Sequence, residues 1–512
     1  MKYRPHPAPA PLLFGYDPVR DLPERHLARL VEWVVEDTVQ PDRGPVRRGQ
    51  PAYDPRLCVK VLVYGYATGV RSSRQLERLC GESLPYLFLT RGETPSYHTL
   101  CTARRERSAE LEAVWVGLLS VAETVGLTRV GRLVVDSTKL RANASSESVV
   151  RTGEYDAVLA ELHRVLAEAE RVDAREAQEG GPGETELKAL PKPDQMRDVL
   201  RRVRKRLAQA KRADEPAAST SGVAEPPPRL TDRMRARVQE AIGVLESVQD
   251  ERRKHVSLTD PDAQMMPEGR EKRLREGHCF EVATDQGLLV AGGSCQDAQD
   301  NGRLLGLVAQ AQEHEPQGVV AVDGDSGYYS GDGVAELIQH TIDTCIPDSH
   351  TASDLHRGLP VGTTRARGRG SVPLHHDSAA DCYRCPQGNE LRRVQERQHC
   401  GQRVRVYRAV TPCRECPLAA QCLTQRRAKH KVLKVGEHHE LLEAARQRFA
   451  DPEHRARYRQ RGRFVEGVFG FLRSVLGFTR WLLRGKDAVR CEASLFQAAY
   501  QLRKVHRLWA AA

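Results

Sequence analysis

Apolar residues first repeat at a regular spacing between residues 18 and 125. After Asp54-Pro55 they recur at intervals of three and four, which is the helical period. An Asp cap followed by Pro is a typical helix start, and Ser73 and Ser96 are candidate starts for two further short helices. The pattern therefore predicts an α-helical N-terminal domain. The apolar positions of its first clear helix are Leu57, Val61 and Tyr64.

From residue 132 the pattern changes to short apolar runs that are typical of buried strands. The run 133–135 ends on Asp136. The runs 279–284 and 288–292 flank a Gly-containing turn, which predicts an antiparallel hairpin. After a helical stretch, the run 318–322 ends close to two further Asp residues. This element order is that of a ribonuclease-H-like core: a strand that ends in a carboxylate, a hairpin, a helix, and a second strand that ends in a carboxylate.

We therefore expect an α/β protein with a ribonuclease-H-like catalytic core, a mixed sheet with flanking helices. A charged, coiled-coil-like helical insertion would interrupt it, because Val158, Leu162 and Val165 keep a spacing of three and four. A Cys-rich, zinc-ribbon-like insertion would follow. The expected boundaries are 18–125 for the N-terminal DNA-binding domain, 130–150 and 257–350 for the first parts of the core, 151–256 for the helical insertion, 370–430 for the Cys-rich insertion, and 440–508 for the C-terminal helical part of the core.

The composition and net charge indicate which kinds of partner the protein binds. The 512 residues carry a net charge of +11, which favours polyanions such as DNA, although an Arg-rich proteome would produce the same excess. No apolar run is long enough for a membrane helix, and the Pro-rich start does not resemble a secretory signal. We expect a protein of the reducing cytoplasm, where clustered cysteines indicate metal binding rather than disulfides.

Two carboxylates stand where neighbouring parallel strands would present them together. Asp136 and Asp325 would suit Mg²⁺, which prefers carboxylate oxygens and activates water for attack on a phosphodiester. Asp323 competes with Asp325, but the turn at 327–328 follows Asp325. Glu466, on a helix predicted over 458–478, is a candidate third carboxylate. By itself it is better explained as part of a surface ion pair.

Three acidic stretches resemble the motifs of bacterial insertion-sequence DDE transposases, most closely the group called eleven-eighty-two. Further stretches resemble the N-terminal domain and other segments of the same group. The acidic stretches are 135–145, 325–330, and 465–470 with Arg473; the others are 53–56, 71–74, 259–263 and 482–485. The chain departs from the pattern in having Ser137 for the usual Gly, Arg473 for Lys, and Gly467 for a frequent His.

The resemblance implies that Asp136, Asp325 and Glu466 bind Mg²⁺ (or Mn²⁺) and form the catalytic triad. The protein would bind terminal inverted repeats, cut the 3′ ends and join them to target DNA. Two copies would hold the ends in a synaptic complex, and the protein would be cytoplasmic and associated with the nucleoid.

Basic residues supply candidate DNA contacts. Arg104 and Arg105 lie on the helix predicted after Ser96, in a region compatible with a helix-turn-helix-like reader. Lys139, Arg461 and Arg473 flank the acidic motifs and would face phosphates. For any single residue of this kind, a solvated basic surface is the alternative.

Six of the 13 cysteines fall between residues 382 and 422. Two Cys-x-x-Cys pairs, Cys382 with Cys385 and Cys413 with Cys416, predict a structural zinc site, because such pairs place two thiolates on one tight turn. Cys422 is a further candidate ligand. Unligated reduced cysteine is the alternative.

Two other functions remain open. A non-catalytic, zinc-containing DNA-binding protein would keep the basic helices and the cysteines and leave the acidic residues incidental. A metal-dependent nuclease without strand transfer would use the same carboxylates, so only its reaction products would distinguish it.

Overall fold

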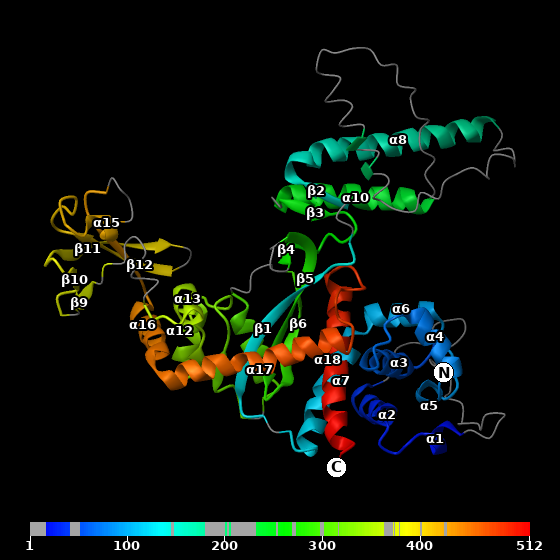
Figure 1. The fold of residues 1–512 in the computed structure, drawn as a ribbon. Helices are drawn as coiled ribbons and strands as arrows, with labels where there is room; N and C mark the ends of the chain where they lie inside the picture. The colour runs from blue at the N-terminus through cyan, green and yellow to red at the C-terminus, as the bar shows by residue number, and fades with distance from the viewer. Residues whose placement is uncertain are drawn as a thin grey trace.

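The computed structural model covers the chain with gaps (Figure 1). The residues that it describes are 17–40, 52–127, 129–144, 148–179, 200–201, 204–205, 232–251, 254–268, 273–296, 302–315, 317–362, 372, 374–377, 379–399, 402–423 and 428–511. The predicted breaks at 180–183 and 213–228 in the helical insertion lie outside these residues.

The N-terminal region is helical, as predicted. Asp54 caps α3 by accepting from the Arg56 amide, and Ser96 caps α6. Ser72 caps α4, whereas the sequence predicted Ser73 as the cap. The helix therefore begins at Ser73, one residue earlier than predicted. The helices are α1 (Pro18–Asp21), α2 (Leu27–Thr38), α3 (Pro55–Ala67), α4 (Ser73–Glu82), α5 (Leu84–Thr90), α6 (Tyr97–Glu106) and α7 (Ser108–Thr124).

A mixed six-stranded sheet forms the centre of the molecule. β1 pairs with β5 in an antiparallel and with β7 in a parallel sense, and β7 pairs in parallel with β8. On the other side, β5 pairs with both β4 and β6. The strands are β1 (Arg132–Arg141), β4 (Gln264–Glu268), β5 (Arg273–Asp285), β6 (Leu288–Cys295), β7 (Ala321–Asp323) and β8 (Asp343–Cys345).

The predicted hairpin is present as β5 and β6. Its turn contains Gln286 and Gly287, both with positive φ, the conformation that tight hairpin turns require. The first strand is longer than predicted. β1 continues to Arg141 because β5 pairs with it along residues 134–141, so Asp136 lies within the strand and not at its end.

Helices cover the sheet and join it to the N-terminal region. α17 (Pro452–Ser474) runs across the strands in Figure 1, and α18 (Lys486–Trp509) packs against α3, α7 and β6. One hydrophobic core therefore includes the N-terminal helices, the sheet, α17 and α18. The connecting helices are α11 (Leu304–Gln312), α12 (Gly331–Gln339) and α13 (Ser349–Arg357).

The helical insertion has a core of its own. Its long helices α8 (Tyr155–Glu179) and α10 (Asp232–Glu251) pack on each other, with Val158, Leu162 and Leu245 buried between them. A two-stranded ribbon of β2 (Val149–Arg151) and β3 (His255–Ser257) connects them to the sheet region, with the short η2 (Thr152–Glu154) between β2 and α8.

The Cys-rich region is an antiparallel five-stranded sheet with a small core, set apart from the central sheet in Figure 1. Its elements are β9 (His375–Asp377), β10 (Cys382–Arg384), β11 (Glu390–His399), β12 (Gln402–Ala409), α15 (Ala419–Cys422) and β13 (Val432–Gly436). α16 (His439–Gln447) and η3 (Arg448–Ala450) lead back to α17. Within the described residues, no helix is both long and apolar enough to cross a membrane.

Candidate active site and cysteine cluster

Asp136 and Asp325 both follow the parallel pairing of β1 with β7. The last paired residues are Val134 on β1 and Asp323 on β7. Asp136 lies two residues further along β1, and Asp325 lies two residues past the end of β7. Asp136 accepts from the Ser137 amide at 2.8 Å, and Asp325 accepts from the Gly327 amide at 2.9 Å. Both side chains are half-buried, so they are within reach of a substrate.

Asp323 has a different environment. Its carboxylate is fully buried and is held by Arg132 Nη2 at 2.7 Å and Arg457 Nε at 2.8 Å. Arg457 also binds Asp343, which in turn binds Arg448 at 2.6 Å. Asp323 and Asp343 thus belong to an ion-pair network that joins β7 and β8 to α17.

α17 brings Arg461 and Tyr458 to the two half-buried carboxylates. Arg461 Nη1 lies 3.8 Å from Asp136 Oδ2, and its guanidinium lies over the Tyr458 ring, 5.3 Å from the centroid. Burial raises the pKa of Tyr458, Arg461 lowers it, and the nearby Asp325 raises it. Tyr458 and Arg461 therefore line the site between the strands and the helix.

Glu466 lies further along the same helix. Arg461 contacts Asp136 and Arg473 contacts Thr138, and Asp136 and Thr138 are on one face of β1. Glu466, between these arginines, is about 7.5 Å beyond Arg461 along the helix axis. Its exposed side chain turns back along the helix, so that a Cβ at position 462 would lie 3.1 Å from its Oε1.

The three carboxylates share a region but are not drawn into a tight cluster. Among the described residues, the group with three ligand atoms all within 4.8 Å of one another is Cys279, Glu281 and Cys295, on the hairpin. Lys139, predicted to contact DNA, is half-buried and lies opposite Cys279 in the β1–β5 register.

Two motifs outside the acidic ones have structural roles that sequence reasoning missed. Asp260 Oδ1 accepts from the Gly485 amide at 3.0 Å, and Asp260 Oδ2 lies 3.0 Å from His278 Nε2 in a fully buried pair. The stretches 259–263 and 482–485 therefore meet in space. The buried Glu492 likewise accepts from Arg71 at 2.8 Å, which ties the N-terminal region to α18.

The predicted DNA contact at Arg104 needs correction. Arg104 is 4% exposed, and its Nη2 donates to the Arg71 carbonyl and to Ser73 Oγ, both at 2.8 Å. It also packs against the Tyr66 ring. The neighbouring Arg105 is exposed and directed to solvent. Sequence spacing identified an Arg-rich helix but not which of its faces is buried.

A pair of substitutions separates these two roles. Arg104→Ala is expected to lower the free energy of unfolding by about 2 kcal/mol, because charge-assisted hydrogen bonds in a buried site are lost. Arg105→Ala is expected to leave stability unchanged and to lower DNA affinity and its salt dependence, as loss of one phosphate contact does. Thermal unfolding and DNA titration at several salt concentrations measure both effects. A weaker DNA complex only for the Arg104 variant, at unchanged stability, would contradict this assignment.

Four cysteines of the Cys-rich region surround one cavity of about 260 Å³. They are Cys385, Cys413, Cys416 and Cys422. Burial raises the pKa of the Cys422 thiol, and the other three cysteines lie close enough to raise it further. Cys382 does not line the cavity, since its buried side chain lies on β10, before the turn that carries Cys385. The cavity thus groups Cys422, and not Cys382, with the other three cysteines.

Hydrogen-bond donors surround this cysteine cluster. The Lys431 amide donates to Cys413 Sγ at 3.4 Å, and the Cys416 amide donates to the Cys413 carbonyl. Lys431 is itself buried, and its Nζ donates to the Cys422 carbonyl at 2.7 Å. Burial raises the pKa of Cys422, and the ammonium of Lys431 opposes part of that rise. The same ammonium would offset part of the negative charge if the cysteines were deprotonated.

Two family models match the chain. Residues 384–506 match a transposase DDE domain, and residues 14–106 match a transposase domain. A search of curated proteins returned no match. Residues 384–506, which include Glu466, are thus similar to a DDE-type transposase domain, and residues 14–106 are similar to a second transposase domain. The two matches together support an insertion-sequence DDE transposase.

Proposed function

We propose that the protein binds the terminal inverted repeats of an insertion sequence, cleaves their 3′ ends and joins them to target DNA. The observation that supports this proposal is the parallel pairing of β1 with β7, after which Asp136 and Asp325 follow, together with the contact of Arg461 on α17 with Asp136. α17 is also the helix that bears Glu466. The order β6-β5-β1-β7-β8, with β5 and β6 antiparallel and β1, β7 and β8 parallel, supports a ribonuclease-H-like core.

The donor set fits hard divalent cations. Asp136 and Asp325 present carboxylate oxygens, the ligands that Mg²⁺ or Mn²⁺ prefers, and Glu466 is a third on the facing helix. Bound there, such ions would activate the attacking water or 3′-hydroxyl and stabilise the leaving oxygen. The Ser137 and Gly327 amides hold the two Asp carboxylates in position. Glu466 would complete the site through rotation of its exposed side chain, because its present rotamer lies along its own helix.

Basic side chains around the carboxylates would hold the DNA backbone. Arg461, which contacts Asp136, and Arg473, which contacts Thr138, would neutralise backbone phosphates near the scissile bond. A second copy of the chain would supply the site for the other transposon end. A homodimer in a synaptic complex therefore belongs to this proposal.

The test is incubation of the protein and Mg²⁺ with linear DNA that carries the flanking inverted repeats. Nicked ends followed by joined products are expected. Hydrolysed ends that never join would support the nuclease alternative, and binding without cleavage would support the non-catalytic alternative.

We further propose that the cysteine cluster binds a structural zinc ion. Four thiols around one cavity, two of them on a tight Cys-x-x-Cys turn, match the donor set of tetrahedral structural sites. Folding of the small five-stranded sheet would then depend on the metal, as in other small metallo-domains.

Substitution of single cysteines tests this ligand set. Cys413→Ser and Cys422→Ser are each expected to lower the bound zinc by about one equivalent per chain, because a structural site needs all four ligands. Cys382→Ser is the matched control and should leave zinc content unchanged. Elemental analysis of the purified protein measures the difference. Loss of zinc in the Cys382 variant with retention in the Cys422 variant would restore the ligand set predicted from sequence.

A further inference from the structure

A second group of metal-ligating side chains lies in the central sheet, away from the cysteine cluster. Cys279 and Glu281 are on β5, and Cys295 is on β6. One ligand atom from each lies within 4.8 Å of the other two, and the three side chains are 0–2% exposed. These three residues belong neither to the acidic motifs nor to the Cys-rich region.

The strand register explains why these side chains converge. Cys279 and Cys295 are direct partners in the antiparallel pairing, and Glu281, two residues after Cys279, is on the same face. Cys279 also forms a side-chain hydrogen bond with Cys295. The partner of Glu281 is Gly293, where an added Cβ would meet nothing within 4 Å. The sheet thus leaves open space beside the Glu281 side chain.

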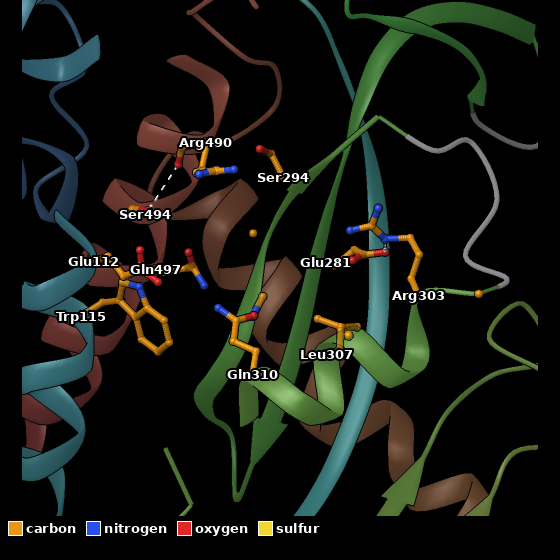
Figure 2. Close-up of a pocket in the computed structure, with 14 residues that line it drawn as sticks. Glu112, Trp115, Glu281, Ser294, Arg303, Leu307, Gln310, Arg490, Ser494 and Gln497 are labelled. Atoms are coloured by element: carbon orange, nitrogen blue, oxygen red, sulfur yellow. Dashed lines mark hydrogen bonds and ion pairs between the residues drawn. The ribbon is translucent and has the colours of Figure 1, made fainter. Parts of the chain in front are cut away.

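A cavity of about 530 Å³ borders this cluster and is lined by Glu281, Gly293 and Ser294. Figure 2 shows Glu281 and Arg303 directed toward each other at its edge, and Arg303 Nε lies 2.5 Å from Glu281 Oε1. Cys279 and Cys295 also pack with Met266 in a small buried apolar cluster. The cavity would provide both an entry path and room for a water ligand.

From this geometry we infer that Cys279, Cys295 and Glu281 bind a thiophilic divalent cation of the zinc class. Two thiolates and one carboxylate are three of the four ligands of a tetrahedral site, and their atoms need to lie about 3.5–4 Å apart around zinc. Binding would release the two thiol protons. The formal charges then balance, because three anionic ligands are offset by the divalent ion and the adjacent Arg303. The ion would fasten β5 to β6 beside β1, the strand that carries Asp136.

Zinc content and the Co²⁺ spectrum test this site in the full-length protein. The double variant Cys279→Ser, Cys295→Ser is expected to lose about one equivalent of zinc relative to wild type. Cys345→Ser, at another buried cysteine, is the matched control and should lose none. Glu281→Gln, which keeps the side-chain shape, should weaken Co²⁺ binding at this site at least about tenfold.

A second set of variants separates metal binding at Cys279, Glu281 and Cys295 from metal binding at the cysteine cluster of the Cys-rich region. A Cys385→Ser, Cys413→Ser variant should still bind Co²⁺ with a thiolate charge-transfer band, and that band should vanish when Cys279→Ser is added. Unchanged zinc in the Cys279, Cys295 double variant would overturn the inference. Absence of a thiolate band in the variant that lacks Cys385 and Cys413 would also overturn it. A Cys279–Cys295 disulfide, found by peptide mapping of protein purified without oxidant, would overturn it as well.

Discussion

Asp136→Asn is expected to abolish cleavage of the inverted-repeat ends while leaving their binding intact. The substitution keeps the side-chain volume and removes one of the charges that would hold the catalytic cations. Loss of such a ligand costs several kcal/mol of transition-state stabilisation, so the cleavage rate should fall by about a thousandfold or more. Single-turnover cleavage of labelled ends, alongside an electrophoretic binding assay, measures both properties.

Asp325→Asn should behave in the same way, because Asp325 follows β7, the parallel neighbour of the strand that carries Asp136, and is the second proposed metal ligand. Asp332→Asn, at an exposed position on α12, is the control for a general effect of lost acidity. Glu466→Gln should also be inactive. End cleavage that survives both Asp136→Asn and Glu466→Gln would defeat the DDE assignment and leave the non-catalytic alternative.

Asp323→Ala should instead destabilise the fold by about 3 kcal/mol or more, because it leaves the partly buried Arg132 and Arg457 without their shared anion. Hydrogen bonding to Asp323 raises the pKa of Arg457 in spite of burial, which lowers it, so this guanidinium stays charged and would be costly to leave unpaired. Chemical denaturation of purified protein, followed by tryptophan fluorescence, gives the change in the free energy of unfolding.

Asp325→Ala is the matched control, two residues away and half-buried. Its effect on stability should be below about 1 kcal/mol, since its carboxylate caps only a local turn. The two variants thus separate the Asp at the end of β7, to which we assign a structural role, from the Asp two residues later that we propose to be catalytic. Equal stability of both variants, with cleavage lost only in Asp323→Ala, would reverse the assignment.

Local signals in the sequence were sufficient to predict many of the helices and strands. Caps and helical periodicity predicted α3 and α6, and the turn with Gly287 predicted the β5–β6 hairpin, because these features depend on neighbouring residues. α18 was not predicted as the helix that joins both halves of the molecule. Its buried Glu492 and Gln501 obscure an apolar pattern, and their partners are distant in sequence.

By itself, the sequence determined the helical N-terminal region, the hairpin, the carboxylates worth testing and the clustering of cysteines, because spacing and local patterns record these. Only the tertiary structure decided how far β1 extends around Asp136, since pairing with β5 lies far along the chain. It likewise showed that Asp323 and Arg104 are already bound to protein groups, and that Cys422 rather than Cys382 faces the other three cysteines. The reason is the same in each case: burial and partner choice depend on residues brought together by folding.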